Sequence, residues 1–427
     1  RVLDALLAGR PGSAVVLRDG RGRRYESPSR LGALPVPGHS VYLTIDAELQ
    51  DIVENALADA IEVYDAAGGD VVVLDPRTGE VLAIASRRSD GSTPPNAFTS
   101  VFEPGSTAKL FAAASLLEGG LVRDRDSVFG EGGTYPRPHR TPIRDEHAEG
   151  WMTLRRAIEV SSNIGIVKFA TRLTPARQYE MLRAFGLGTP TGIEYPAESR
   201  GSLPRPDEWS GLTSSSLAMG YEMAVTPLQL AQAYAAIAND GVMLRPSLLR
   251  RIEAPPPDGR VLQRHVPEPV RRVVRPDVAA ELRSMLRGVV YPEGTGSTAA
   301  LTSYELAGKT GTARRAGNGG YVPGAYFATF ASLFPAENPQ LVMVVKLDDP
   351  RGAYARVTAA PVTRAVIEQV LAARTGALDP GALGVMQPLA ATEPLVGGGS
   401  APYVVSWPLV DSSAEAVGRR VPNPSGL

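Results

Sequence analysis

The chain has 427 residues, of which 44 are basic and 45 acidic, and its net charge of −1 gives no electrostatic reason to expect a nucleic-acid partner. It has no cysteine, which excludes disulfides, iron–sulfur clusters, thiolate zinc sites and a cysteine nucleophile. None of the four histidines shows a metal-ligand spacing, so we interpret them as ordinary polar residues and expect neither a metal nor a cofactor. The length suggests one large domain or two, with appendages.

The start of the chain predicts a separate module. Residues 1–40 are rich in glycine and arginine and contain short β-like pieces, which is typical of the end of an irregular, non-catalytic module, or pedestal. No apolar run in the chain approaches the ~18 residues that are needed to cross a bilayer. Because the sequence begins with Arg1, in the middle of such a pattern, we expect it to be a fragment of a longer protein.

A main domain is predicted over residues 41–375, and it begins with a helix and a hairpin. The helix follows Asp46, and residues 69–86 hold two apolar runs joined by Pro-Arg-Thr-Gly-Glu, which is typical of a β-hairpin. A second helix is predicted from Ser106 to the glycines at 119 and 120. The apolar residues that recur at helical spacing in the first helix are Leu49, Ile52, Val53, Ala56, Leu57 and Ala60.

The rest of the domain predicts an α+β fold (an α/β sandwich). Strands at both ends bracket a helical insert, so we expect one antiparallel five-stranded sheet, assembled from distant parts of the chain and flanked by helices. Residues 376–427 shift to Gly, Pro, Ser and Ala, which predicts a linker. The predicted helices cover 151–175, 225–240, 276–288 and 359–374, and the predicted strands cover 303–315, 326–335 and 340–350.

Lysine is rare in this chain, which draws attention to the places where it occurs. The 44 basic residues include only Lys109, Lys168, Lys309 and Lys346 as lysines. Arginine stays protonated in proteins, whereas a desolvated lysine can lose its proton and act as a base. Ser106 and Lys109 form an S-x-x-K motif, so on a helix they share one face and the amine can activate the hydroxyl. Chance alone gives about 0.3 such matches, so this motif is weak by itself.

A second motif, K-T-G-T at 309–312, lies inside a predicted strand. Gly311 leaves room for a ligand backbone to lie against the strand. Lys309 and the hydroxyls of Thr310 and Thr312 would form a cradle for a carboxylate. Chance gives about 0.02 K-T-G matches, so this is the stronger signal; the competing interpretation is a solvated edge strand with a common turn.

The third motif, Ser161-Ser162-Asn163, is an S-x-N sequence between predicted helical runs. In isolation it is better explained as a helix cap. Its value comes from its place between the other two motifs. The chain contains no G-x-S-x-G elbow, and no histidine adjoins a nucleophile candidate, so other serine-hydrolase schemes fit less well.

The three motifs in this order resemble those of penicillin-binding proteins and serine β-lactamases. Over roughly residues 1–375 the sequence is similar to the transpeptidase domain of class B penicillin-binding proteins, most closely the division-specific (FtsI-like) type. The final VPNPSGL resembles the opening of a PASTA module. The middle motif departs from the Ser-Asp-Asn of class A β-lactamases, and no convincing deacylation glutamate is visible. Other matching segments are LTIDAELQ, VLDPRTGEVLAIAS, FEPGSTAK, SSNIGIVKFA, MAVTPLQLAQAYAAIANDGVMLRP, GTGSTAALTSYELAGKTGTA and DDPRGAY.

The resemblance implies four catalytic residues. Ser106 is expected to attack the carbonyl between the two terminal D-alanines of a peptidoglycan stem peptide while Lys109 takes its proton. Ser161 and Lys309 are expected to relay a proton to the departing D-alanine. An amine of a neighbouring strand would then open the acyl-enzyme and form the cross-link.

The resemblance also implies the substrate contacts. Asn163 is expected to hold the substrate amide, and Thr310, Gly311 and Thr312 are expected, with the adjoining lysine, to receive the terminal carboxylate. The backbone N–H groups of Ser106 and Thr312 are expected to hold the oxyanion.

The expected partners follow from the same resemblance. They are stem peptides ending in D-Ala-D-Ala, β-lactam antibiotics, a membrane glycosyltransferase (FtsW-like) and other division proteins. The expected location is the extracytoplasmic face of the bacterial cytoplasmic membrane, with an N-terminal transmembrane anchor outside this fragment. Two alternatives stay open: a D,D-carboxypeptidase or β-lactamase of the same fold, and a non-catalytic β-lactam sensor.

Overall fold

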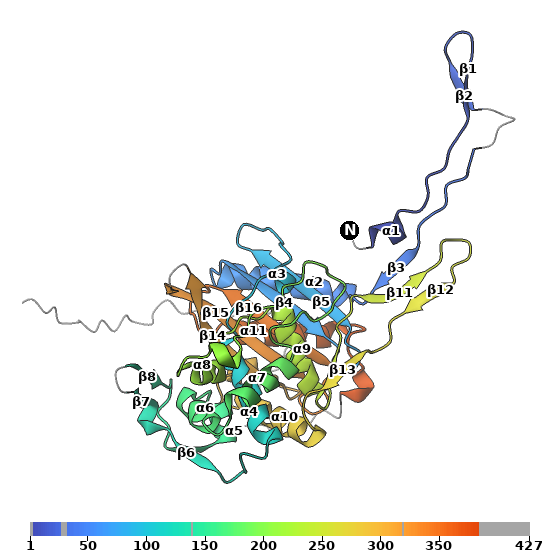
Figure 1. The fold of residues 1–427 in the computed structure, drawn as a ribbon. Helices are drawn as coiled ribbons and strands as arrows, with labels where there is room; N and C mark the ends of the chain where they lie inside the picture. The colour runs from blue at the N-terminus through green and yellow to red at the C-terminus, as the bar shows by residue number, and fades with distance from the viewer. Residues whose placement is uncertain (1–2, 27–31, 138–139, 318–319, 384–427) are drawn as a thin grey trace, which may run out of the picture. The chain divides into compact units, whose positions relative to one another are not determined.

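An antiparallel five-stranded sheet joins the two ends of the main domain (Figure 1). The computed structural model describes residues 3–26, 32–137, 140–317 and 320–383. The strand order is β14-β15-β16-β4-β5, so the hairpin predicted near the start pairs with the three strands predicted near the end. This arrangement confirms the predicted fold class. The strands are β4 (Gly68–Leu74), β5 (Val81–Arg88), β14 (Ala307–Gly317), β15 (Gly320–Phe334) and β16 (Leu341–Asp348).

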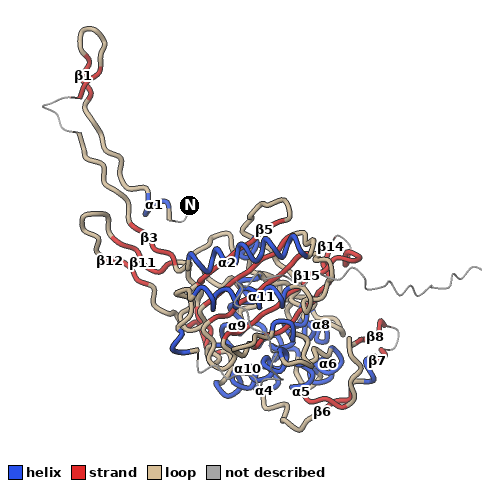
Figure 2. The backbone as a smooth tube through the Cα atoms, turned by 180° about the vertical axis from the view of Figure 1, so that it is seen from behind, coloured by secondary structure: helices blue, strands red, loops and turns tan. Residues whose placement is uncertain are grey.

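Both faces of the sheet are covered, because its central strands are apolar on both sides. Val71 and Val73 of β4 pack in one hydrophobic cluster with α2 (Ala47–Val63) and α11 (Ala359–Ala373). Val72 packs in a second cluster on the opposite face. This alternation explains why the strand is a continuous apolar run in the sequence. Figure 2 shows α2 and α11 lying across the first face.

The helix α2 forms as the sequence predicts. Asp46 is its N-cap, and the side chain accepts a hydrogen bond of 2.9 Å from the backbone N–H of Leu49. All six apolar positions predicted for its inner face are buried. The cap fixes where the helix begins, and the apolar stripe fixes which side meets the sheet.

The second face carries the helical insert. Its helices are α4 (Lys109–Glu118), α5 (Leu154–Glu159), α6 (Asn163–Ala170), α8 (Thr213–Met219), α9 (Pro227–Ala238) and α10 (Pro276–Val290). Helix α9 is buried along almost its whole length and packs against the central strands, which explains its Ala- and Leu-rich sequence. Figure 1 shows these helices grouped together below the sheet.

The single helix predicted over 151–175 is wrong. The segment starts with strand β9 (Trp151–Thr153) and is then divided into α5 and α6. The break lies at Ser161, whose φ of 57° is left-handed and cannot continue a helix. Ser162 then starts α6, because its hydroxyl accepts a 2.8 Å hydrogen bond from the N–H of Gly165. Capping residues inside an apolar pattern therefore mark a boundary that periodicity alone does not show.

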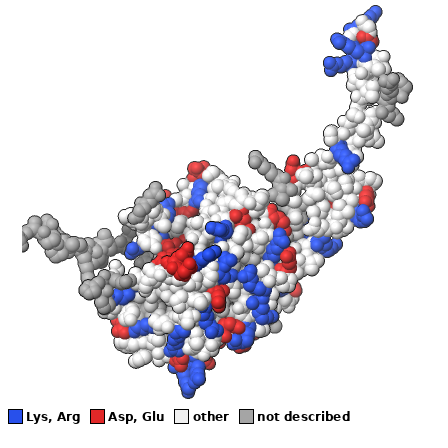
Figure 3. Space-filling view, in the orientation of Figure 1, with Lys and Arg blue, Asp and Glu red and all other residues white. Residues whose placement is uncertain are grey.

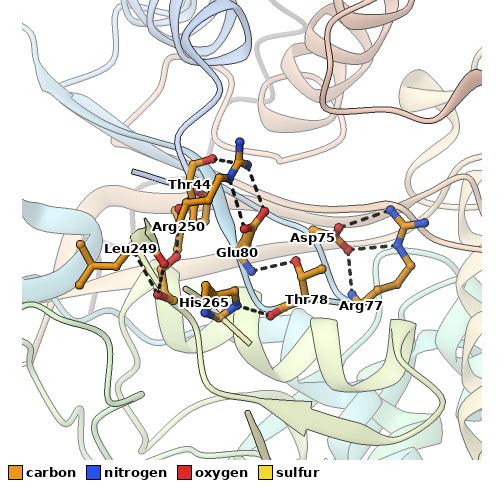
Figure 4. A network of polar contacts seen from close by, with 10 residues as sticks. Thr44, Asp75, Arg77, Thr78, Glu80, Leu249, Arg250 and His265 are labelled. Atoms are coloured by element: carbon orange, nitrogen blue, oxygen red, sulfur yellow. Dashed lines mark hydrogen bonds and ion pairs between the residues drawn. The ribbon is translucent and has the colours of Figure 1, made fainter. Parts of the chain in front are cut away.

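A small three-stranded sheet meets the β4–β5 turn through a polar network (Figure 4). Its strands, in spatial order, are β12 (Val261–Arg264), β11 (Leu249–Glu253) and β3 (Ser40–Leu43). Arg250 forms an ion pair of 3.1 Å with Glu80, and it also donates to the backbone O of Thr44. His265 Nε2 lies 2.9 Å from the carbonyl O of Thr78. His265 is thus a structural polar residue, and the network joins strand β3 to the hairpin of the central sheet.

The remaining strands and α-helices of the described residues have between 3 and 10 residues each. They are α1 (Asp4–Leu7), β1 (Val16–Arg18), β2 (Arg24–Glu26), α3 (Asn96–Thr99), β6 (Ser127–Phe129), β7 (Thr134–Arg137), β8 (Arg140–Arg144), α7 (Pro175–Ala184), β10 (Val242–Leu244) and β13 (Pro269–Arg272). Among the described residues, no helix combines the length and apolarity that a membrane crossing requires.

The predicted linker falls largely outside the described residues, which end at residue 383. Its first part, 376–383, packs on the domain: Leu378 is buried, and the N–H of Asp379 donates to Gln340 Oε1 at 2.7 Å. The PASTA-like VPNPSGL lies outside the described residues. By its internal contacts the chain divides into residues 1–387 and 388–427.

The surface carries both charge signs. Figure 3 shows lysine and arginine interspersed with aspartate and glutamate over the face that it displays. This mixture agrees with the net charge of −1 for the whole sequence.

Candidate active site

Ser106 lies in a short 3-10 helix, Gly105–Ala108, that continues directly into α4. In this tighter helix, residues i and i+3 eclipse each other, so Ser106 and Lys109 lie on the same side. Tyr234 stabilises this turn, because its buried hydroxyl donates a 2.8 Å hydrogen bond to the backbone O of Thr107. A second hydrogen bond, of 3.1 Å, joins the N–H of Gly105 in the turn to the carbonyl of Gly220.

Strand β14 packs directly against this turn, and Gly311 permits the approach. A Cβ on Gly311 would lie 2.8 Å from the carbonyl O of Pro104 and 2.9 Å from Cγ2 of Thr107. The sequence interpretation left this space for a ligand backbone, but the structure fills it with the turn that carries Ser106. The glycine therefore brings the K-T-G-T strand next to the nucleophile, and its contact with substrate stays a prediction.

Ser161 lies between the two lysines of the motifs. Its hydroxyl accepts from Lys309 Nζ at 2.8 Å and from Lys109 Nζ at 3.3 Å. Lys109 also donates to the backbone O of Ser161. The structure thus brings together four predicted catalytic residues that come from three separate parts of the chain. The expected hydrogen bond between Ser106 and Lys109 is not among those of the described residues; such bonds often shorten only when substrate is bound.

Burial makes these two lysines unusual. Both side chains are fully buried. Burial lowers the pKa of Lys109 to about 7, and the negative charges of Asp145 and Glu146 oppose that shift. Burial, together with the positive charge of Lys109, holds the pKa of Lys309 well below its usual range. A neutral lysine amine next to Ser106 can accept a proton near neutral pH.

The predicted substrate-binding residues lie at the start of α6 and along β14, where polar contacts hold their side chains. The side-chain amide of Asn163 donates to the backbone O of Arg144 at 2.8 Å, which orients it at the start of α6. Thr310 Oγ1 lies 2.8 Å from Thr295 Oγ1, and Thr312 Oγ1 accepts from the N–H of Ala355 at 3.2 Å. By strand alternation, Thr310 and Thr312 share one side of β14, opposite to Lys309. Their roles toward a carboxylate stay predictions.

The predicted oxyanion donors are the backbone N–H groups of Ser106 and Thr312. A Cβ on Gly105 would lie 3.3 Å from the backbone O of Thr312, so the two backbones run side by side. Ser106 lies near the N-terminal end of its helix, where N–H groups lack intrahelical acceptors. The two segments are therefore adjacent, as an oxyanion site requires.

Sequence reasoning missed several residues around the site. Asp145 accepts from the backbone N–H groups of Asn163 and Ile164 and from the hydroxyl of Ser162. It lies in IRDEHAEG, which has no periodicity that would single it out.

Glu103 was also missed as a partner in the site. Its half-buried carboxylate accepts from Tyr321 Oη and from the N–H of Glu222, each at 2.9 Å. Burial raises the pKa of Glu103. Its carboxylate therefore joins the β14–β15 hairpin to the segment that leads into Ser106. Among the described residues, no group of three or more His, Asp or Glu side chains is placed to hold a metal ion.

Comparisons with known proteins place this site in a family. The penicillin-binding protein transpeptidase domain matches residues 69–368. The chain belongs to that family. PbpB of Mycolicibacterium smegmatis is 38% identical over 372 residues, which are 82% of this chain and 57% of the relative. The peptidoglycan D,D-transpeptidase FtsI of Escherichia coli is 34% identical over 393 residues, which are 89% of this chain and 63% of the relative.

Solved structures of the family share the fold. Penicillin-binding protein 3 of Mycobacterium tuberculosis, complexed with ampicillin, superposes with a TM-score of 0.74 at 34% identity, covering 90% of this chain and 86% of that one. The transpeptidase domain of Burkholderia pseudomallei penicillin-binding protein 3 gives a TM-score of 0.69 at 32% identity, with 78% of this chain and 96% of that one covered. The chain spans less than two thirds of the length of the two curated relatives named above.

Proposed function

We propose that this penicillin-binding protein domain is a peptidoglycan D,D-transpeptidase that acts through an acyl-enzyme on Ser106 and is acylated by β-lactams. One observation carries the proposal: Ser161 Oγ lies 3.3 Å from Nζ of the buried Lys109 and 2.8 Å from Nζ of Lys309, beside the Ser106 turn. This arrangement links a base for the nucleophile to an acid for the leaving group through one hydroxyl.

In the acylation step, a proton moves from the nucleophile through Lys109, Ser161 and Lys309 toward the leaving group. Ser106 Oγ attacks the carbonyl carbon between the two terminal D-alanines, and its proton passes to the neutral amine of Lys109. The N–H groups of Ser106 and Thr312 stabilise the charge on the carbonyl oxygen. The C–N bond breaks, the departing D-alanine amine takes a proton delivered by way of Ser161 and Lys309, and an ester on Ser106 remains.

The second step reverses the proton movement. An amine from a neighbouring stem peptide attacks the ester carbonyl and loses a proton to the lysine–serine chain. The Ser106 C–O bond breaks, Ser106 recovers its proton, and a new peptide bond cross-links the two strands. In this scheme Asn163 holds the substrate amide, while Lys309, Thr310 and Thr312 bind the terminal carboxylate of the donor.

The setting follows from the substrate. Peptidoglycan lies outside the cytoplasmic membrane, so we place the domain on the extracytoplasmic side, joined to a membrane anchor in the full protein. Similarity to FtsI supports a role in cell division, with a membrane glycosyltransferase (FtsW-like) and other division proteins as partners. The complexes of the mycobacterial relative with aztreonam and ampicillin support β-lactams as ligands.

The test is incubation with a fluorescent penicillin, followed over hours by intact mass and peptide mapping. We expect one adduct per chain on Ser106 that persists for hours, and none on Ser106→Ala. An adduct that clears within seconds would favour a β-lactamase. A persistent label on Ser106→Ala would contradict the nucleophile.

A second assay separates the transpeptidase from the other two alternatives. A donor stem peptide ending in D-Ala-D-Ala is supplied with and without an acceptor amine, and the products are separated by chromatography. We expect D-alanine release with a cross-linked product when the amine is present. Hydrolysis alone would indicate a D,D-carboxypeptidase, and labelling by penicillin without any turnover would indicate a sensor.

A further inference from the structure

We propose that Asp145 is a positioning residue for this reaction: its carboxylate holds the Ser161–Asn163 segment so that the Ser161 hydroxyl stays between Lys109 and Lys309. The proposal rests on the proposed function and deepens it. It arises because Asp145 reaches the motif from a different part of the chain, the segment between β8 and β9.

Asp145 makes three contacts with the motif and the helix that follows it. One oxygen, Oδ1, accepts the backbone N–H of Asn163 and, at 3.1 Å, that of Ile164. The other oxygen accepts the hydroxyl of Ser162. A carboxylate that accepts two N–H groups at a helix start is favoured by the helix dipole, so the contact is strong and directional.

Ser161 needs such support because its backbone is strained. Its φ of 57° is rare for a residue with a side chain, and such a conformation persists only where the surrounding structure imposes it. On its N-terminal side, Ser161 N–H donates to the carbonyl of Ile158 at 3.1 Å, at the end of α5. On its C-terminal side, the start of α6 is fixed by Asp145. The strained residue is therefore held from both directions.

The charge of Asp145 also acts on the lysine base. The charged groups that act on the Lys109 pKa are the carboxylates of Asp145 and Glu146, while Lys309 shares the Ser161 hydroxyl with Lys109. The two carboxylates work against the lowering of the Lys109 pKa by burial. Removing the Asp145 charge should therefore lower the pKa of Lys109 further. An uncharged cap of α6 would have no such effect on that pKa.

The test uses two variants. Asp145→Asn keeps an oxygen for the N–H groups of Asn163 and Ile164 but removes the charge. We expect near-native folding, a modestly slower acylation by fluorescent penicillin, and a pH–rate profile that moves to lower pH. Asp145→Ala removes both contacts and charge, and we expect acylation to fall about tenfold or more at every pH, because misplacement of catalytic groups is costly.

The scarcity of lysine gives a readout that does not depend on activity. With four lysines in the chain, ¹³C-lysine labelling yields a spectrum in which each side chain can be titrated and assigned by single replacements. We expect the Lys109 midpoint of Asp145→Asn to fall below that of the wild type. This titration tests the effect of Asp145 even if the penicillin assay failed to support the proposed function.

A matched control is Asp126→Asn, which removes a carboxylate that pairs with Arg172 at 2.6 Å in the same helical part of the protein. We expect it to keep both the wild-type acylation profile and the Lys109 midpoint. If the two Asp145 variants lowered only the melting temperature and left the acylation rate, its pH profile and the lysine titration unchanged, the proposal would be overturned and Asp145 would be a helix cap.

Discussion

This protein buries lysine side chains at two places. The lysine pKa is lowered at one place and raised at the other. At the active site, Lys109 and Lys309 face each other across the hydroxyl of Ser161. In the middle of the sheet, Lys346 of β16 lies 2.9 Å from Asp70 of β4 and also contacts Asp348. Burial would lower the pKa of Lys346, but the two aspartates raise it above its ordinary value. Burial alone therefore does not decide whether a lysine is protonated, because the charges of the neighbouring side chains also shift its pKa.

The comparison explains where this chain retains lysine. Of its four lysines, the three at positions 109, 309 and 346 are buried, while the large majority of its basic residues are arginines. Lys109 requires a group that can be neutral, which arginine cannot supply. Lys346 requires a compact ammonium, because it lies between two aspartates and 5.4 Å and 5.0 Å from the ring centres of Phe102 and Phe327.

The two places are also connected through the sheet. Gly311, Thr329, Lys346 and Asp70 are register partners across four neighbouring strands. Gly311 supports the Ser106 turn, and Lys346 supports Phe102, which leads into that turn. Substitutions at the active-site lysine should therefore change mainly the acylation rate, and substitutions at Lys346 should change mainly the free energy of unfolding. Each should have a small effect on the other quantity.

The largest expected effect is at the active-site lysine. Lys109→Met removes the base, and acylation by fluorescent penicillin should fall by roughly 10²–10⁴-fold. The unfolding free energy should stay the same or rise, because a desolvated amine is replaced by an apolar side chain of similar length. Stopped-flow labelling and thermal unfolding measure the two quantities. Normal acylation in this variant would rule out the base role.

The corresponding substitution in the sheet, at Lys346, should lower stability and leave acylation nearly unchanged. Lys346→Met leaves Asp70 without its cation and removes one of the two cations that pair with Asp348, which should lower the unfolding free energy by about 3–5 kcal/mol. Acylation per folded molecule should change little. The folded pKa of Lys346 is raised, so its contribution is fully present below the unfolded value of about 10.4 and is lost as pH rises through the folded pKa. Denaturant unfolding at several pH values checks this.

A double variant sharpens that result. In Lys346→Met/Asp70→Leu, the pair is replaced by apolar side chains, while Asp348 keeps its contact with Arg88. Much of the lost stability should return, because replacing both members of a buried pair is often nearly neutral. If the double variant were as unstable as the single one, the unpaired Asp70 would not be the cause.

A methyl group at the contact between the strand and the turn should have a moderate effect. Gly311→Ala places a Cβ 2.8 Å from the Pro104 carbonyl, which must move. We expect a loss of about 1–3 kcal/mol in stability, as in other overpacked sites, together with slower acylation. Gly150→Ala is a suitable control, since no atom lies within 4 Å of the added Cβ. Equal acylation rates in the two variants would contradict the tight contact.

The smallest expected effect is the pH dependence of the wild type. Lys109 must be neutral to accept the proton, and burial lowers its pKa to about 7. The acylation rate should therefore rise with pH below that value, about tenfold per unit, and level off above it. Penicillin labelling between pH 5 and pH 9, on protein verified as folded, measures the profile. A flat profile would exclude Lys109 as the titrating base.

The sequence predicts the elements that have local signals and misses those that depend on distant contacts. The cap at Asp46, the hairpin and the three late strands all carry their own patterns, and the structure has them. Periodicity predicted one helix over 151–175, although the S-x-N motif inside it carries the signal of a helix cap. Asp145, which accepts a hydrogen bond at the start of α6, lies outside the motif and has no periodic context.

The candidate site shows the same division. Its motif residues were identifiable, because S-x-x-K, S-x-N and K-T-G occur together and in this order. Their arrangement was not, because Ser161 meets Lys309 only after two segments 148 positions apart come together. Likewise, the strand that contains Lys346 was predicted, but its partner Asp70 is set by strand register, which periodicity does not specify.

The strand order of the sheet has a consequence for folding during synthesis. Strand β5 ends at Arg88, yet the strands that complete the sheet begin at Ala307. Pairing across such a loop is slow, because its closure entropy must be overcome before any contact compensates for it. The nucleophile segment thus leaves the ribosome well before the strand that must lie beside it. Under the proposed function, a growing chain should not react with β-lactams until its last strands are in place, and only the complete domain should be acylated.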